Sequence, residues 1–226
     1  MAERIPRWEA ELWSYVSGSD GAQCPLCDSC QVRHRGGWCP SEHIEQIDEL
    51  VDGRCSNPSD DDSIGCVISC RIFNLVEMLA QKYVSKKKVC YPPVPAELVS
   101  LADQQHPIEI RLVPLVAYHG AIWHLRDRWI IQLNENDEPS TRRFTLFHEV
   151  FHILAHRKAT PVFRKGALKA GRFNELLAEQ FATCILMPRK WVSEKWVEEN
   201  DLSKLAETFG VPKSVACVRL KLLHLI

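Results

Sequence analysis

One pentapeptide, His148-Glu149-Val150-Phe151-His152, constrains the fold of this chain more than any other feature. It lies in an apolar stretch preceded by the capping residues Ser140 and Thr141, which predicts a largely buried helix ending near His156. Histidines four residues apart share one helical face, about 6 Å apart, so both imidazoles reach one tetrahedral zinc ion. Glu149 stands beside that position, where it can accept the proton of a water that zinc acidifies. The pattern therefore predicts a metal site with its own general base.

A site of this kind needs a third protein ligand. His156 is nearest in sequence, but eight residues of helix separate it from His148 by about 12 Å, which one ion does not bridge. We expect the ligand on a later helix, where Glu175 shares a face with small alanines that allow close packing against the histidine helix. Glu179, one turn further along, is the alternative.

Cysteines are concentrated near the N-terminus, with seven of the ten between Cys24 and Cys70. Three thiolates spaced CxxCxxC fit three corners of an iron–sulfur cluster, with a fourth cysteine closing it, and four thiolates also fit a structural zinc. The core of the pattern is Cys24, Cys27, Cys30 and Cys39, and further candidate ligands are Cys55, Cys66, Cys70, His34 and His43. The spacing predicts a second metal site and leaves a [4Fe-4S] cluster and Zn²⁺ both open.

Charge divides the chain in a similar place. The first 62 residues carry 13 acidic residues, five arginines and no lysine, although the whole chain has a net charge of only −1. Lys86-Lys87-Lys88 and the Pro92-Pro93 pair have the composition of a linker, because proline does not continue a helix. We therefore expect a Cys-rich metal-binding or regulatory module over residues 1–90 and a second domain over residues 91–226.

Hydrophobic periodicity predicts a mostly helical α+β chain. Strands are expected at 108–113, 115–119 and 123–133, the last with a candidate turn at Asp127-Arg128. Helices are expected at 5–17, 42–52, 63–84, 95–102, 140–156, 172–187, 188–199, 201–209 and 212–223.

Three blocks of sequence together resemble the ImmA/IrrE family of metallopeptidases. They run from Thr141 to His156, from Glu175 to Pro188 and from Leu205 to Leu220. The resemblance covers about residues 92–226 and implies a zincin-like metallopeptidase domain with a small three-stranded sheet. It also implies the zinc ligands His148, His152 and Glu175, with Glu149 as the catalytic acid/base.

The same resemblance implies one protein substrate, a helix-turn-helix transcriptional repressor of mobile-element or stress genes. Two positions depart from the family pattern, since Phe151 stands where glycine is common and Glu179 where asparagine is frequent. The N-terminal module does not resemble the helix-turn-helix domain that some members carry.

These features favour a zinc-dependent endopeptidase that acts on one protein partner and is gated by the Cys-rich module. The alternative is a non-proteolytic regulator that binds and sequesters a repressor. Near-neutral charge disfavours direct nucleic-acid binding, and the absence of a long apolar run or a signal-like N-terminus predicts a cytoplasmic protein without a membrane helix. Tyr118, His119 and His124 are the candidates for oxyanion stabilisation, and the pattern does not choose among them.

Overall fold

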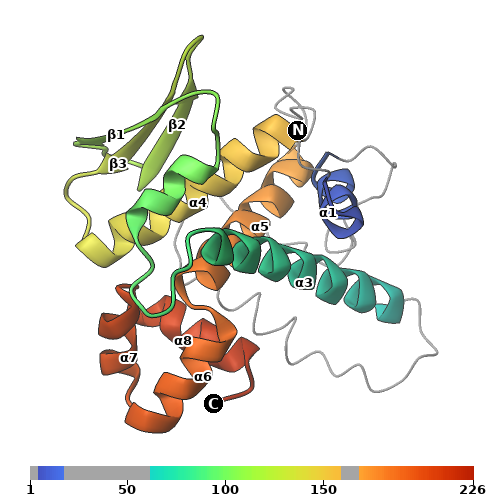
Figure 1. Ribbon diagram of the computed structural model, residues 1–226, viewed down its shortest axis with the longest axis vertical. Helices are drawn as coiled ribbons and strands as arrows, with labels where there is room; N and C mark the ends of the chain where they lie inside the picture. Colours follow the sequence, from blue (N-terminus) through green and yellow to red (C-terminus); the bar gives the residue numbers. More distant parts are fainter. Residues whose placement is uncertain (1–4, 18–61, 159–167) are drawn as a thin grey trace.

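A computed structural model describes residues 5–17, 62–158 and 168–226, with side chains described over 5–16, 71–155 and 174–226. Its helices, in chain order, are α1 (Arg7–Ser17), α3 (Asp62–Lys86), the 3₁₀ helix η1 (Ala96–Leu101), α4 (Pro139–Lys158), α5 (Leu168–Leu186), α6 (Arg189–Glu199), α7 (Leu202–Phe209) and α8 (Lys213–Leu222). Its strands are β1 (Ile108–Val113), β2 (Gly120–His124) and β3 (Trp129–Asn134). The α+β prediction with a three-stranded sheet is thereby confirmed (Figure 1). The predicted helix over 42–52 lies outside the described residues.

The strand order is β1-β3-β2, with β1 parallel and β2 antiparallel to β3. The candidate turn within the run expected over 123–133 is confirmed, because the Leu125 N–H donates to the Arg128 carbonyl (2.9 Å) and divides that run into the β2–β3 hairpin. The strand expected over 115–119 was wrong. Pro114 has no N–H to donate, and the Leu115 N–H turns back to the Val113 carbonyl (3.0 Å), so this run is a loop.

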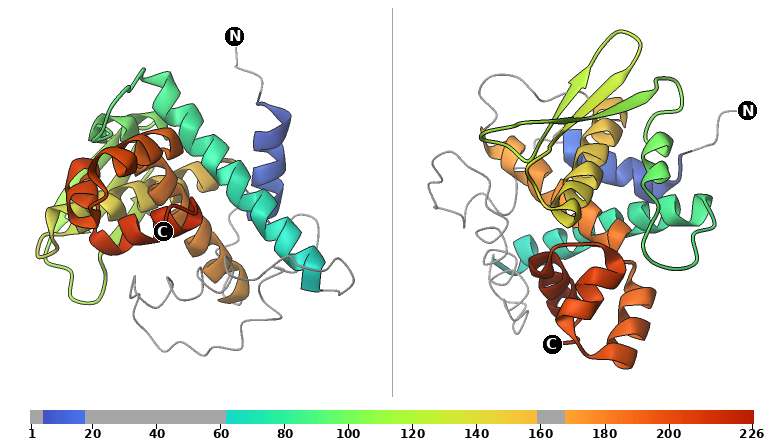
Figure 2. Two further views of the ribbon diagram at one scale, coloured as in Figure 1. Left: turned by 90° about the horizontal axis from the view of Figure 1, so that it is seen from below. Right: turned by 90° about the vertical axis from the view of Figure 1, so that its left-hand side faces the viewer.

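One face of the sheet packs on α4 (Figure 2). Alternate residues of the central strand, Trp129, Ile131 and Leu133, are at most 4% exposed. They share their face with Gly120 of β2, which lies directly against α4. The hydrophobic effect thus fixes the start of β2 over the histidine-bearing helix.

The helical layer centres on the pair α4 and α5, with α3 packed along α5 and α1 packed on α3 and α4 (Figure 1). A single hydrophobic cluster joins residues of α1 and α3 to residues of α4 and α5. The division at residue 90 stays a prediction, and the described helices on both sides of it share this core.

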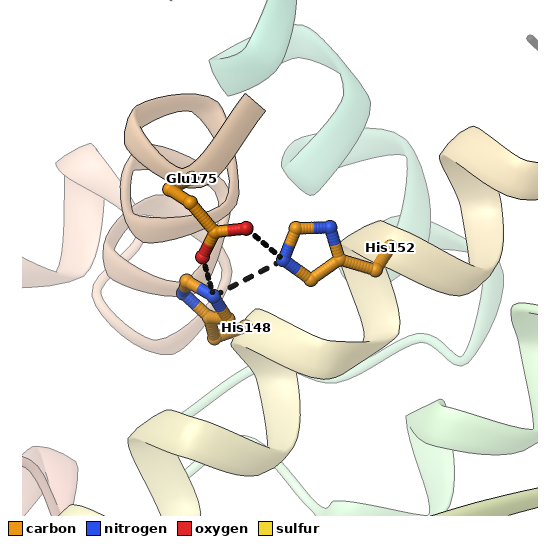
Figure 3. Close-up of side chains that lie close together, drawn as sticks. All are labelled: His148, His152 and Glu175. Carbon is orange, nitrogen blue, oxygen red and sulfur yellow. Dashed lines mark hydrogen bonds and ion pairs between the residues drawn. The ribbon is translucent and has the colours of Figure 1, made fainter. Parts of the chain in front are cut away.

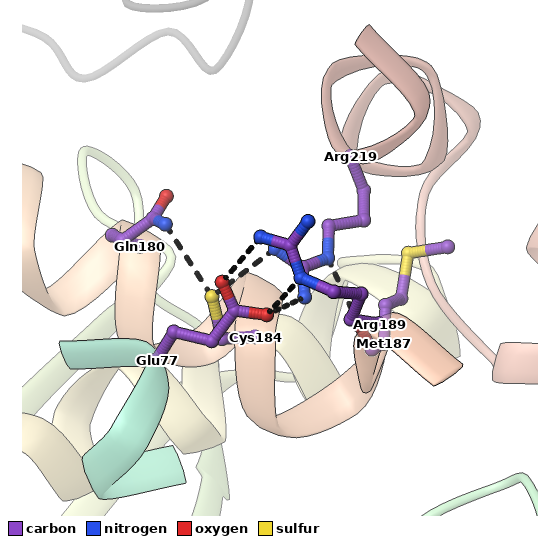
Figure 4. Close-up of polar contacts among 6 residues, drawn as sticks. All are labelled: Glu77, Gln180, Cys184, Met187, Arg189 and Arg219. Atoms are coloured by element: carbon purple, nitrogen blue, oxygen red, sulfur yellow. Dashed lines mark hydrogen bonds and ion pairs between the residues drawn. The ribbon is translucent and has the colours of Figure 1, made fainter. Parts of the chain in front are cut away.

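A buried ionic cluster ties α3 to the C-terminal helices (Figure 4). Glu77 accepts hydrogen bonds from Arg219 Nη2 (2.8 Å) and Arg189 Nη2 (3.0 Å). Arg219, only 1% exposed, also donates through Nε to the Met187 carbonyl (3.0 Å) and contacts Cys184 Sγ (3.4 Å). The arginine at the end of the third sequence block therefore holds the C-terminal helices in place. Among the described helices, none is long and apolar enough to cross a lipid bilayer.

Candidate metal centre

The two histidines of the pentapeptide lie one turn apart on α4 and point toward α5 (Figure 3). Their Nε2 atoms are 3.2 Å apart, and both side chains are only 10% exposed. Apolar residues of the same helix, including Phe147 and Phe151, are fully buried in the core and fix the orientation of α4. This orientation determines where the two imidazole rings lie. Packing of the helix thus fixes both rings before any ion binds.

Glu175 reaches the same point from α5. Its Oε2 lies 3.0 Å from His148 Nε2, and its Oε1 lies 3.3 Å from His152 Nε2. Ala178 and Ala182, both fully buried on α5, leave room for the close approach of the two helices. Three side chains from two helices, the outermost 27 residues apart in sequence, are therefore brought to one position (Figure 3).

The donor set fits zinc. Two imidazole nitrogens and one carboxylate are ligands that zinc accepts, at about 2.0–2.2 Å each, which places neighbouring donors of a tetrahedron about 3.3 Å apart. The 3.2 Å between the two Nε2 atoms matches that edge, and each of these nitrogens has one oxygen of the Glu175 carboxylate 3.0–3.3 Å away. In the described residues this is the one group of three or more such side chains whose donor atoms all lie within 4.8 Å of one another.

The electrostatics of the cluster reflect the same closeness. Burial opposes ionisation of Glu175, but hydrogen bonds from His148 and His152 outweigh it and hold the pKa of this carboxyl well below its usual range. Burial also lowers the pKa of His148, and its hydrogen bond to Glu175 reverses that effect, so the net shift is upward. The carboxylate is ionised at neutral pH, as a metal ligand must be.

Glu149 lies beside the three converging side chains and is 7% exposed. Burial raises the pKa of its carboxyl, while the neighbouring histidines partly offset the shift. A raised pKa is the direction expected for a group that both accepts and donates a proton near neutral pH.

Gly120 is a site residue that sequence reasoning missed. A Cβ atom at this position would lie 2.5 Å from Thr145 Cγ2 and 3.0 Å from Glu149 Oε1. Only a glycine lets β2 approach α4 this closely without displacing Thr145 or crowding the glutamate. The signal in the sequence was a glycine at the start of a strand, a position that often marks close backbone approach.

The other candidates from the sequence lie elsewhere. Glu179 is buried on α5 but is not part of the converging group, and the side chain of His156 lies outside the described residues. Tyr118 is 71% exposed, His119 Nδ1 is bonded to Asp137 (2.6 Å), and His124 stacks on Trp129 at 4.1 Å between ring centroids. These contacts assign none of the three to the oxyanion.

The N-terminal cysteine site is not described. Cys24, Cys27, Cys30, Cys39 and Cys55 lie outside the described residues, as do His34 and His43. Cys66 and Cys70 belong to α3, but their side chains are not described either. The [4Fe-4S] and Zn²⁺ alternatives both stay predictions.

Comparison with known proteins agrees with this geometry. The chain is 28% identical over 149 residues to "Uncharacterized immunity region protein 2" of Bacillus phage phi105, an alignment that spans 64% of this chain and 88% of the phage protein. The fold is similar to that of a solved structure titled "Mycobacterium tuberculosis transcriptional regulator", with a TM-score of 0.50 and 17% identity, covering 81% of this chain and 52% of that one. The profile of Peptidase_M78, described as an IrrE N-terminal-like domain, matches residues 103–221, which is more than half of the chain. The protein therefore belongs to the Peptidase_M78 family of metallopeptidases.

Proposed function

We propose that this protein is a zinc-dependent endopeptidase of the HExxH type that cleaves one protein partner, a helix-turn-helix transcriptional repressor. The observation that carries the proposal is the convergence of His148, His152 and Glu175 on one point, with a buried Glu149 beside it. His148, His152 and Glu175 would hold the zinc ion, which when bound supplies Lewis acidity toward a peptide carbonyl and toward water.

Glu149 supplies the proton transfers. Its carboxylate accepts a proton from the attacking water and then donates it to the leaving amine, and the raised pKa suits both steps. The absence of a side chain at Gly120 leaves space for this carboxylate.

The β2 edge supports a substrate-binding role. In the described part of the chain β2 pairs only with β3, so its other edge is unpaired, and its first residue, Gly120, lies close to Glu149. The sequence of β2, GAIWH, has no proline, lysine or acid that would block pairing, whereas β1 carries Glu109 and Arg111, joined at 2.8 Å. An extended segment of a protein substrate can add to β2 through main-chain hydrogen bonds and bring its backbone to the site.

The choice of a repressor as substrate has two supports. One is the resemblance to ImmA/IrrE proteins, and the other is the phage relative whose name places it in an immunity region. We further propose that the Cys-rich module gates the site. A visible absorption spectrum of anaerobically purified protein distinguishes the two metal alternatives for this module. A colourless sample excludes an iron–sulfur cluster and favours structural zinc.

Glu149→Gln tests the hydrolytic mechanism. We expect zinc content to be unchanged and the rate of cleavage to fall by about 10²–10⁴-fold, because the proton acceptor is lost. The readout is new protein N-termini in a cell lysate treated with wild-type or variant protein, and the expected result is one substrate with a helix-turn-helix domain. If Glu149→Gln relieves repression as well as wild type, the protein acts by sequestering the repressor and the proposal is wrong.

A further inference from the structure

An aromatic chain links the N-terminal helix to the metal centre. Trp13 of α1 contacts Phe151 of α4, with ring centroids 6.0 Å apart, and Phe151 is fully buried. Phe151 directly precedes His152 in sequence, and their rings are 6.3 Å apart. Helix α1 lies outside residues 103–221, the part of the chain that matches the family profile.

Phe151 also sets the contact between the two helices that carry the predicted ligands. Its ring lies 5.6 Å from Phe181 of α5, and Phe181 in turn meets Tyr83 of α3 edge-on at 6.1 Å. Zinc requires donors from α4 and α5 at fixed separations, so a small shift of one helix against the other weakens the site. The Phe151 ring therefore contacts both α5 and Trp13 of α1.

Polar contacts hold Trp13 in turn. Its indole N–H donates to Glu9 Oε1 (3.4 Å), and Glu9, 5% exposed, accepts from Lys82 Nζ of α3 at 2.6 Å. Trp13 is itself 5% exposed. A buried carboxylate and a cross-helix ion pair thus restrict the orientation of this indole.

We propose that Trp13 is a positioning residue for the metal centre, acting through Phe151 on the placement of His152 and on the α4–α5 contact. The inference rests on the proposed metal site and adds that the zinc affinity of the site depends on α1.

The test is zinc affinity of the full-length protein, measured by competition with a chromogenic chelator. Only the zinc equivalent that His148→Ala removes is scored, so that zinc held by cysteines does not contribute. Outer contacts of metal ligands typically change affinity by 10–100-fold, and we expect Trp13→Leu to weaken zinc binding about tenfold. Trp13→Phe keeps an aromatic ring and should stay within about threefold of wild type.

Two further variants separate positioning from general stability. Leu205→Ala in α7 removes a fully buried side chain from a helix that packs on α6 and α8, and it should leave zinc affinity unchanged. Phe151→Leu should weaken zinc binding, and adding Trp13→Leu to it should weaken binding little further, because both act through one contact. The Co²⁺ absorption bands that His148→Ala removes should shift in Trp13→Leu and not in Leu205→Ala.

Wild-type zinc affinity and an unchanged cobalt spectrum in Trp13→Leu would overturn the inference, as would an equal loss of affinity in Leu205→Ala. Trp13→Met, whose longer and more flexible side chain adapts better to the space left by the indole, serves the same purpose if Trp13→Leu does not fold. Failure of the underlying proposal is distinguishable, because His148→Ala would then remove no zinc.

Discussion

Glu77 and Glu175 each lie between two basic side chains. The two clusters differ in whether protein side chains alone satisfy the carboxylate or whether a metal ion is also needed. Glu77 is 10% exposed and faces Arg189 and Arg219, which stay protonated at any ordinary pH. Glu175 is 45% exposed and faces two imidazoles whose Nε2 atoms point at each other at 3.2 Å. The first cluster is closed by the two guanidinium groups, whereas the second presents two imidazole nitrogens and a carboxylate on a partly exposed side, where an ion can enter.

Glu77→Ala breaks the closed cluster and has the largest expected effect on stability. It leaves the 1%-exposed guanidinium of Arg219 without its carboxylate, and breaking a buried pair in this way costs about 3–5 kcal/mol. Urea unfolding measures the loss. Glu194→Ala, which removes an exposed carboxylate 3.9 Å from Lys190, is the matched control and should cost less than about 1 kcal/mol. Equal losses in the two variants would mean that the closed cluster does not stabilise the fold.

Glu175→Gln tests the second cluster, in which the carboxylate is a predicted zinc ligand. We expect zinc affinity to fall by more than about a hundredfold, since removal of a direct ligand exceeds the effect of outer contacts. The unfolding free energy of the metal-free protein should also fall, because the variant removes the ion pairs with His148 and His152 that lower the pKa of Glu175. Glu179→Gln, one turn along the same helix, should keep its zinc in the same titration. Loss of zinc in Glu179→Gln alone would make Glu179 the third ligand.

Gly120→Ala perturbs the open cluster without touching a predicted ligand. The added methyl group must displace Thr145 or Glu149, and a misplacement of about 1 Å at a reacting group costs about a hundredfold in rate. Cleavage should therefore fall while zinc content stays at the wild-type value. Ala121→Ser, at the next position and on the opposite face of β2, is the control. Full cleavage by Gly120→Ala would contradict the assigned position of Glu149.

Asp103, like Glu77, is a buried carboxylate whose hydrogen-bond partners all come from the protein. Burial alone would raise its pKa, but hydrogen bonds from the Trp129 indole, the Gln105 N–H and His106 lower it from 3.8 to about 2. A depressed pKa stabilises the folded state above about pH 4, and that contribution is lost as the pH falls toward 2.

The shift corresponds to about 2 kcal/mol, which Asp103→Asn should remove. Urea unfolding between pH 6 and pH 2.5 measures it, and the variant should show a flatter acid limb than wild type. An identical pH dependence in both proteins would rule out Asp103 as its source.

Local sequence predicted those parts of the molecule that depend on helical period. Histidines at i and i+4 must share a face of α4, and the small residues beside Glu175 favoured close packing of α5 on α4. The helices from α4 to α8 follow the predicted ranges within a few residues for the same reason.

Contacts between distant segments were not predictable in this way. Glu77 and Arg219 are 142 residues apart, and no local pattern pairs them. Gly120 matters only because β2 packs on α4, and neither of the strands expected over 115–119 and 123–133 included it. The departure at Phe151 indicated unusual packing next to His152, but its partners Trp13 and Phe181 became identifiable only in the folded chain.

The central claim is that two imidazoles of α4 and one carboxylate of α5 bind a catalytic zinc ion. Metal analysis per chain, on wild type, His148→Ala and Glu149→Gln, tests it most directly. We expect His148→Ala to lose one zinc and to keep any metal held by the cysteines, while Glu149→Gln keeps the full complement and is inactive. Zinc content that is the same in His148→Ala and wild type would contradict it.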